Sequence, residues 1–349
     1  MSDKTQFGIV SFAHYHANFW SEVINESPDA DLVGVWDDNP ERGKERAAHY
    51  NTDFYPELDA LLEKCDAVGI TTETVKHLEM VKKAAGAGCH ILLEKPMAMT
   101  VEECREIRAT ITQAGIIFQQ SFPKRYDPIN HELVEHVKSG ALGKIAMVRV
   151  RHANFHLREL GHSAAAEWFG DPKQSGGGSL LDEGIHAADF LLWLLGEPTQ
   201  VYGTHSSSAL GLGLDDTGMA IFNYPNGTIA ELVSSGTFIA AEESIEVYGT
   251  EGSAILTGVD LASRDFSSTP YLRFFHYGDE RGAWRTSNET PAFKKGYFHQ
   301  RGPLHFLRAL RGEVEPVVSL DEGWKSLAMI EAAYRAAETG QAQPLDFSV

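Results

Sequence analysis

The chain has 349 residues, of which 43% are hydrophobic and 23% charged, an ordinary balance for a globular protein and enough length for two domains. Its formal net charge of −19 disfavours nucleic acids and anionic membranes as partners, because polyanions need compensating lysine and arginine patches. The three cysteines form no C-x-x-C pair, and neither an apolar signal core nor a run of about 18 apolar residues occurs, so we expect a soluble cytoplasmic protein with reduced thiols.

Up to Gln119 the sequence alternates short apolar runs with amphipathic stretches. The runs predict parallel strands at Phe7–Phe12, Asp31–Trp36, Ala67–Ile70, His90–Leu93 and Ile116–Gln119. The stretches between them predict helices at Ala17–Asn25, Glu41–His49, Val75–Ala87 and Val101–Thr112. This alternation indicates a doubly wound α/β domain, in which ligands bind outside the carboxyl ends of the strands.

After Ser121 strands follow one another without intervening helices. They are predicted at Ile145–His152, Val201–His205, Gly218–Asn223, Thr228–Val233, Ser244–Tyr248 and Ser253–Leu256. We expect an antiparallel sheet covered by an apolar helix at Gly184–Leu195, and a closing helix at Asp321–Thr339. The predicted domains are residues 1–122 and 123–349, with the closing helix able to pack back on the first.

The first strand-to-helix turn lacks the G-x-G-x-x-G of dinucleotide folds, since Ser11, Ala13 and His16 occupy the glycine positions. Taken alone, this segment does not identify a nucleotide site, and an ordinary strand-to-helix turn is the favoured interpretation. Asp37, at the end of the second strand, favours a dinucleotide because an acid there accepts ribose hydroxyls and repels a 2′-phosphate. It indicates NAD, with NADP the less favoured cofactor. The alternative role for Asp37 is a helix cap before Pro40.

Two charged residues, Glu94 and Lys95, directly follow the fourth predicted strand and precede Pro96. They must lie at the strand end, where water or a ligand can solvate them. Beside a nicotinamide ring, Lys95 would stabilise developing alkoxide charge. The alternative is a surface ion pair of little energetic weight.

Asp182, His186 and Asp189 are spaced to share one face of an otherwise apolar helix that follows three glycines. In the functional interpretation, His186 is the general base towards a substrate hydroxyl and Asp182 supports it. The alternative is a partly solvated helical pair.

The chain has 15 histidines, and His152, His156 and His162 lie close in sequence. Their spacing matches no metal motif, so we expect no metal. His156 is instead predicted to line a polar substrate pocket, whose wall Phe155, Trp168 and Phe169 could form.

With these residues in place, the chain resembles the glucose-fructose oxidoreductase/inositol dehydrogenase (Gfo/Idh/MocA) family over nearly its whole length. The family's strand-end acid matches Asp37, its T-P-N-x-x-H is similar to the segment Thr72 to His77, its E-K-P matches Glu94 to Pro96, and its G-G-G-x-L-x-D-x-G-x-H-x-x-D matches Gly176 to Asp189. The main departure is the missing glycine fingerprint.

The resemblance implies an N-terminal Rossmann domain with a doubly wound parallel sheet and a C-terminal α/β domain with an open, mainly antiparallel sheet, through which a homodimer or homotetramer would form. It implies Lys95, Asp182 and His186 as the catalytic set, with Trp168 near the nicotinamide. The cofactor set it suggests is Ser11, Phe12, Ala13, His14, Asp37, Thr72, His77, Glu94, Lys95 and Trp168, and the substrate set is Lys95, His156, Asp182 and His186.

We therefore expect NAD-dependent hydride transfer between nicotinamide and a secondary alcohol or ketone of a sugar, inositol or related polyol. A second hypothesis is an NAD-dependent glycoside hydrolase of the same superfamily, which oxidises its substrate only transiently. A third is a regulator that senses NAD or sugar without catalysis. The sequence does not distinguish the substrate.

Overall fold

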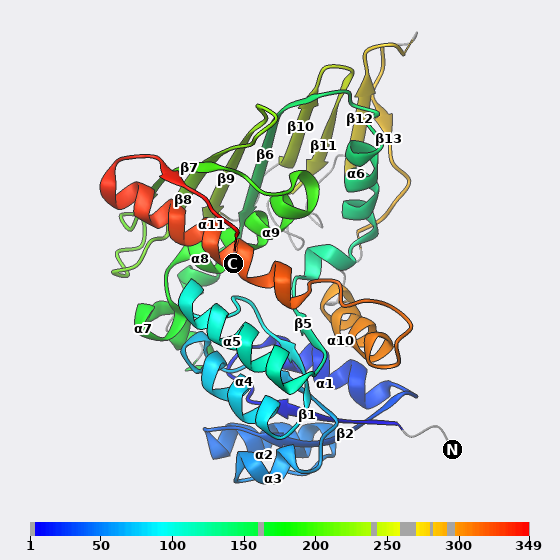
Figure 1. Cartoon of the computed structure of the whole chain (residues 1–349), viewed down its shortest axis with the longest axis vertical. Coiled ribbons are helices and arrows are strands. Elements are labelled where there is room, and N and C mark those ends of the chain that lie inside the picture. The colour runs from blue at the N-terminus through cyan, green and yellow to red at the C-terminus, as the bar shows by residue number, and fades with distance from the viewer. Residues whose placement is uncertain are drawn as a thin grey trace.

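Two β-sheets lie along the long axis of the molecule, with helices packed between them (Figure 1). The structure is a computed structural model and describes residues 4–159, 164–238, 243–258, 270–279, 282–291 and 297–348. None of the helices in these ranges has the length and hydrophobicity needed to cross a membrane.

The first sheet has five parallel strands, as the sequence predicts, and their order in the sheet is β2-β1-β3-β4-β5. They are β1 (Thr5–Val10), β2 (Ala30–Trp36), β3 (Ala67–Ile70), β4 (His90–Leu93) and β5 (Phe118–Gln120). The helices of this half are α1 (His16–Glu26), α2 (Pro40–Tyr50), α3 (Leu58–Leu62), α4 (His77–Gly86) and α5 (Val101–Ala114), with a 3-10 turn η1 (Thr74–Lys76) before α4. Only α3 and η1 were not predicted as separate elements.

Capping chemistry fixes where α2 begins, which matters for the site below. The Asn39 side chain accepts hydrogen bonds from the amides of Glu41 and Arg42, and Pro40 occupies the first helical position. The cap starts the helix immediately after β2. It thereby brings Arg42 back over the end of that strand.

A helix from late in the chain completes the first layer. Helix α10 (Tyr297–Leu310) packs on α1, and Phe306 meets Phe7 edge-on with ring centroids 6.4 Å apart. The sequence analysis missed α10 because a polar segment precedes it and Pro303 interrupts its helical pattern. The C-terminal half of the chain therefore contributes to the core of the first layer.

The second sheet has nine strands in the order β13-β12-β11-β10-β6-β9-β8-β7-β14. They are β6 (Ile145–Ala153), β7 (Gln200–Ser206), β8 (Thr217–Asn223), β9 (Ile229–Ser235), β10 (Glu243–Gly249), β11 (Gly252–Thr257), β12 (Leu272–His276), β13 (Arg285–Thr286) and β14 (Gln343–Pro344). All neighbouring strands are antiparallel except β6 and β9, so the predicted mainly antiparallel sheet is confirmed.

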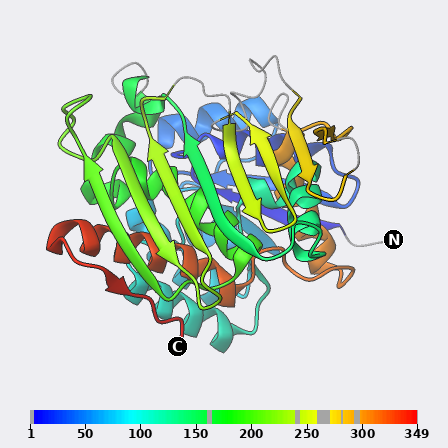
Figure 2. The ribbon, with the colours of Figure 1, turned by 90° about the horizontal axis from the view of Figure 1, so that it is seen from above.

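One face of the second sheet is buried under helices α9 (Gly184–Leu195) and α11 (Leu320–Thr339). Alternate residues such as Val148, Leu232 and Phe222 point to that face and are fully buried. Helix α11 approaches so closely that a side chain at Gly203 would meet the carbonyl of Ala333. Among the described residues, no helix covers the opposite face of the central strands (Figure 2).

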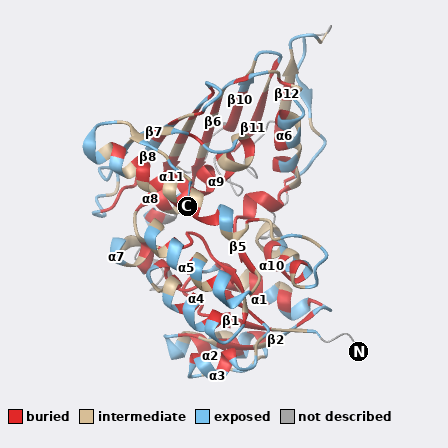
Figure 3. Ribbon diagram, viewed as in Figure 1, coloured by how far each residue is buried: buried red, intermediate tan, exposed pale blue. Residues whose placement is uncertain are grey.

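The connections between the sheets hold short elements and one longer helix, α6 (Pro128–Lys138), which the sequence analysis missed. The others are η2 (Pro123–Tyr126), η3 (His156–Glu159), η4 (Ala164–Gly170), α7 (Pro172–Ser175) and α8 (Ser179–Asp182). Buried residues run through the first sheet and through the helices between the sheets (Figure 3). The predicted site residues lie at this junction.

Candidate active site

The backbone amides of the first strand-to-helix turn already donate hydrogen bonds within the protein. The amide of Phe12 donates to Asp37 (2.7 Å), that of Ala13 to the Ser11 hydroxyl (3.1 Å), and that of His14 to the carbonyl of Thr71 (2.9 Å). Ser11 takes a positive φ of 74°, a conformation that glycine adopts more readily. A pyrophosphate bonded to these amides would have to replace existing bonds, so that contact stays a prediction.

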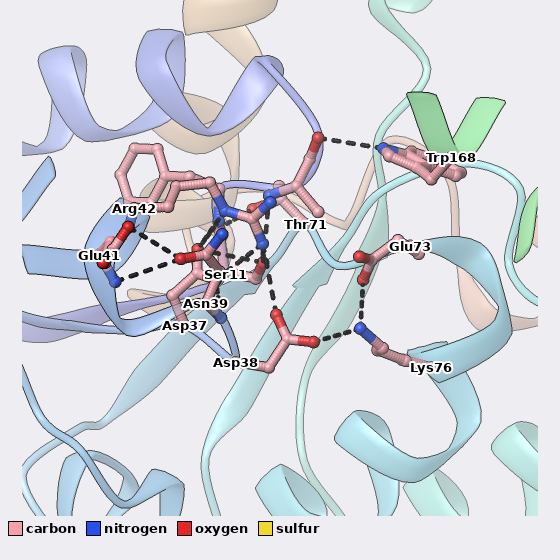
Figure 4. A network of polar contacts seen from close by, with 12 residues as sticks. Ser11, Asp37, Asp38, Asn39, Glu41, Arg42, Thr71, Glu73, Lys76 and Trp168 are labelled. Atoms are coloured by element: carbon pink, nitrogen blue, oxygen red, sulfur yellow. Dashed lines mark hydrogen bonds and ion pairs between the residues drawn. The ribbon is translucent and has the colours of Figure 1, made fainter. Parts of the chain in front are cut away.

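Asp37 is fully enclosed at the end of β2 (Figure 4). Besides the Phe12 amide, it accepts from the Asn39 amide (2.8 Å), from the Ser11 hydroxyl (3.3 Å) and from the Arg42 guanidinium at 2.8 and 2.7 Å. The sequence analysis missed Arg42, although the Asn39 cap that positions it was visible as a signal.

Thr72 and His77 connect the end of β3 to the segment after β4. The His77 ring nitrogens lie 2.9 Å from the carbonyl of Pro96 and 3.3 Å from that of Thr72, and burial lowers the pKa of this histidine. Both nitrogens therefore bond to backbone, and His77 holds two loops together. The hydroxyl of Thr72 is buried and has no hydrogen-bond partner among the described residues.

Lys95 meets Asp182 across the junction of the two halves. Its Nζ lies 2.6 Å from Oδ1 and 3.0 Å from the backbone oxygen of Asp182, and its side chain is only 4% exposed. Burial opposes the lysine charge, but the carboxylates of Asp182, Glu183 and Glu94 outweigh burial and raise the pKa of Lys95. The lysine is therefore a fixed cation, and the peptide bond between it and the next residue, Pro96, is cis.

His186, in the first turn of α9, is buried beside the rings of His152 and Phe122, with centroids 4.8 and 5.9 Å away. Burial, and next the charge of Lys95, lower its pKa well below the ordinary value. The imidazole is consequently neutral near pH 7, which is the form that accepts a proton. Lys95 and Asp182 are in direct contact, and His186 lies near enough for the lysine charge to lower its pKa, so the catalytic role of the three residues stays a prediction.

Asp182, His186 and Asp189 do not lie on one continuous helix. Glu183 interrupts the helix, so Asp182 ends α8 while His186 lies in the first turn of α9. Asp189 instead forms a two-point ion pair with Arg125, at 2.9 Å for each contact, and both side chains are buried. The expectation of one polar helix face was wrong for two reasons. The helix breaks at Glu183, and Asp189 is paired with Arg125, 64 residues away in the chain.

Three further polar residues near His186, namely Glu183, Asn154 and Lys124, were not singled out from the sequence. Glu183 accepts from Asn154 (2.6 Å) and lies 3.2 Å from Nε2 of His152, and Lys124 is close enough to lower the pKa of His186. The available signal for Lys124 and Arg125 was a charged pair shortly after a buried strand, the same pattern that identified Lys95. Glu183 stands inside the recognised motif itself.

His14, His16 and Glu94 form a buried group beneath the first turn, with potential ligand atoms within 4.8 Å of one another. Nδ1 of His16 lies 2.6 Å from Oε1 of Glu94, whose other oxygen accepts from the Lys95 amide at 2.9 Å. We interpret the group as a hydrogen-bonded support that fixes Glu94 and the start of the Lys95 loop.

Trp168 joins the second half of the chain to the first turn. Its indole nitrogen donates to the carbonyl of Ala13 at 3.1 Å, and its ring stacks on Phe169 with centroids 3.9 Å apart. The side chain of His156 and the whole of His162 lie outside the described residues. Trp168 is thus placed beside the turn, and the His156 expectation stays a prediction.

The region at the carboxyl ends of β1 and β3 has features that fit a dinucleotide. The strand order reverses beside β1, the position at which such sheets bind cofactors. Two polar atoms there, Thr72 Oγ1 and His16 Nε2, are buried without a hydrogen-bond partner among the described residues. Buried polar atoms are normally satisfied, so these two suit a ligand.

Comparison with known proteins identifies the family. The profile of an oxidoreductase family with an NAD-binding Rossmann fold matches residues 6–122, and the GFO/IDH/MocA C-terminal domain profile matches residues 131–255. The chain belongs to the Gfo/Idh/MocA family. The resemblance inferred from the motifs is thereby confirmed.

Relatives within this family act on sugars. A 1,5-anhydro-D-fructose reductase from Ensifer adhaerens is 29% identical over 286 residues, or 80% of each chain, and a D-glucoside 3-dehydrogenase from Escherichia coli (strain K12) is 26% identical over 333 residues, or 89% of each. The crystal structure of an aldose-aldose oxidoreductase from Caulobacter crescentus, complexed with glycerol, has a TM-score of 0.82 at 25% identity, covering 98% of this chain and all of that one (100%). Both NAD(+) and NADP(+) enzymes occur among similar proteins.

Proposed function

We propose that this protein is an NAD-dependent oxidoreductase that interconverts a secondary alcohol and a ketone on a sugar, inositol or related polyol. The observation that carries the proposal is the meeting of Lys95 and Asp182 across the junction, with a neutral His186 beside them. A fixed cation and a neutral base are the two groups that removing a hydroxyl proton requires.

The cofactor set follows the crevice from the first turn to β4. It comprises Ser11, Phe12, Ala13 and His14 in the turn, Asp37 at the end of β2, Thr72 and His77 after β3, Glu94 and Lys95 after β4, and Trp168 from η4. The acidic end of β2 favours NAD over NADP, because it repels a 2′-phosphate. When bound, the nicotinamide supplies the hydride acceptor or donor.

In the oxidative direction, Lys95 Nζ donates a hydrogen bond to the substrate hydroxyl oxygen and the His186 imidazole takes its proton. The hydrogen on the same carbon would leave with both bonding electrons, as the hydride that a bound nicotinamide would accept, so the alcohol would become a ketone and His186 would become charged. Asp182 holds Lys95 in place, and the lysine charge stabilises the negative charge that develops on the oxygen. His156 completes the proposed substrate set.

We further propose that residues 1–122 and 123–349 are the two functional domains, and that the protein works in the cytoplasm as a homodimer or homotetramer. Cys65, Cys89 and Cys104 are all free thiols, which supports a reducing compartment. The open face of the second sheet is the surface that supports self-association.

The test is a screen of NAD and NADP reduction against sugars, inositols and glycosides, run with the wild type and with Lys95→Ala and His186→Ala. We expect NADH to accumulate with at least one free sugar or polyol, and turnover to fall by orders of magnitude in both variants while NAD still binds. Near-normal turnover in both variants would contradict the mechanism. Tight NAD binding without turnover of any substrate would favour the sensor hypothesis.

A reaction without net oxidation is the second candidate function. A protein 25% identical to this chain over 361 residues is a 2,7-anhydro-N-acetylneuraminate hydratase from Escherichia coli (strain K12), and adding water to a substrate changes no net redox state. The buried pair of Glu183 and His152 near His186 supplies further acid–base groups for such chemistry. Release of an aglycone from a glycoside without NADH accumulation would favour the glycoside hydrolase hypothesis over net oxidation of a sugar.

A further inference from the structure

Glu183 is a buried carboxylate in the break between α8 and α9. Its side chain is 8% exposed, and burying a charged group costs stability unless polar partners compensate for the lost water. Asn154 donates to Oε1 at 2.6 Å, and Oε2 lies 3.2 Å from Nε2 of His152. Both partners come from the second sheet, His152 from the end of β6 and Asn154 from the residue directly after that strand.

Strand β6 directs His152 towards the candidate site. Side chains alternate between the two faces of a strand, and His152 shares its face with Val148 and Val150, which are fully buried on the side that α9 covers. The ring of His152 lies beside the ring of His186, with centroids 4.8 Å apart and planes inclined at 65°. The carboxylate that fixes one imidazole therefore fixes the neighbour of the other.

Charged groups act on His186 from several elements. Lys95 follows β4, Lys124 lies in η2, Asp182 ends α8 and His152 lies in β6. Burial lowers the pKa of His186 most, the charges of Lys95 and then His152 lower it further, and Asp182 opposes them. His152 has this effect only in its protonated form, which an adjacent carboxylate stabilises. Each sheet thus supplies a group whose positive charge acts on the base.

We propose that Glu183 is a positioning residue that controls the protonation of the general base His186 through His152. The inference rests on the proposed function and deepens it. Glu183 accepts a hydrogen bond from Nε2 of His152 and favours the imidazolium form of that ring. The imidazolium repels a proton on His186, which keeps the base neutral before the reaction and eases loss of the proton afterwards.

Glu183 also acts on Lys95, and this second effect can be separated from the first. Burial lowers the pKa of Lys95, whereas the carboxylate of Asp182 and next that of Glu183 raise it. In Glu183→Gln the contact of 2.6 Å between Lys95 and Asp182 remains, so the lysine keeps its charge. A change in the titration of His186 then reports the state of His152.

The sign of that change is the test. Removal of a carboxylate that acted directly on His186 would lower the titration midpoint of the base. If Glu183 acts through His152, the midpoint rises instead, because His152 loses the partner that favours its charged form and the nearer positive charge disappears. We expect a rise of at least about half a pH unit in Glu183→Gln and of about one pH unit in His152→Gln.

The measurement is a pH titration of the full-length, ¹⁵N-histidine-labelled protein by NMR, with His186→Gln used to assign the resonance. The double variant Glu183→Gln/His152→Gln should titrate like Glu183→Gln alone, because neither carries a charge at the two positions. The acid limb of kcat/KM, measured with a sugar or polyol found in the substrate screen, should move with the midpoint. His152→Asn provides a second variant if the glutamine protein is unstable.

The matched control is His205→Gln, which removes an exposed histidine of β7 and should leave both readouts unchanged. A midpoint that falls or stays in Glu183→Gln, or that stays in both His152 variants, would overturn the inference while an oxidoreductase function still stands. If the midpoints move as expected and no sugar or polyol is turned over, the proposed function fails and the control of His186 by Glu183 stands.

Discussion

The ammonium of Lys95 touches both Oδ1 and the backbone oxygen of Asp182, a residue 87 positions later in the chain. Lys95 comes from the end of β4 in the first sheet, and Asp182 ends the short helix before α9 under the second sheet. The contact therefore exists only when both halves of the protein are assembled. It fixes the cation within electrostatic reach of His186.

Replacing Lys95 should impair the chemical step more than cofactor binding. We expect Lys95→Met to lower kcat by about 10²–10³-fold, the loss seen when a donor to a developing oxyanion is removed. Steady-state rates and NAD titration of the same preparation measure the two effects separately. Lys325→Met, which removes a lysine from an exposed ion pair with Glu197, is the matched control and should keep wild-type rates.

The pH dependence of kcat/KM should report the protonation of His186. Because burial and Lys95 place its pKa below the ordinary 6.5, the base is neutral at pH 7, and kcat/KM should fall only when the pH drops below about 6.5. In Lys95→Met the repelling charge is gone, so the acid limb should move to higher pH. A limb that stays at the same pH in the variant would show that Lys95 does not act on the base.

Much of this site was predictable because its signals are local. Parallel strands buried on both faces read as continuous apolar runs, and charged residues directly after such a run must lie at its end, as Lys95 does. The run from Asp182 to His186 likewise carries its spacing within a few residues. These features do not depend on where the rest of the chain goes.

The features that were missed depend on distant partners or weak patterns. Asp189 was placed on the polar helix face with Asp182 and His186, and its partner, Arg125, was not foreseen because it is 64 residues away and no local pattern reveals the pair. Strands β13 and β14 have two residues each, too few for a period of two to appear. The ion pair between Arg42 and Asp37 was missed because it depends on the exact start of α2. Helix boundaries are the least certain part of a sequence-based prediction.

The Arg125–Asp189 ion pair should stabilise the fold around α9 and take no part in catalysis. Asp189→Asn leaves a buried guanidinium without its counter-charge, so we expect a loss of about 3–5 kcal/mol in the free energy of unfolding, measured with urea. The double variant Arg125→Met/Asp189→Leu should recover most of that stability, because both buried charges are removed together. Failure of the double variant to recover stability would show that the pair contributes more than charge balance.

The open face of the second sheet should mediate self-association. Tyr202 and Ile221 are paired across β7 and β8 on that face, and they are 48% and 37% exposed. Met219, Ile229 and Tyr248 extend the apolar surface over neighbouring strands, and Arg149 forms ion pairs with Glu231 and Glu246 on the same sheet. Exposed apolar patches of this kind mark interaction sites, and a sheet face without covering helices suits a second copy of the chain.

We expect the wild type to be a dimer or tetramer by light scattering, and Ile221→Lys to shift it towards a smaller species, because a buried unpaired charge disfavours an apolar interface. Tyr277→Lys is the matched control, since Tyr277 is 82% exposed and lies beyond the end of β12, outside the patch. If both variants keep the wild-type mass, association occurs through another surface. If the wild type is itself a monomer, Lys95, Asp182 and His186 still meet, because all three belong to one chain.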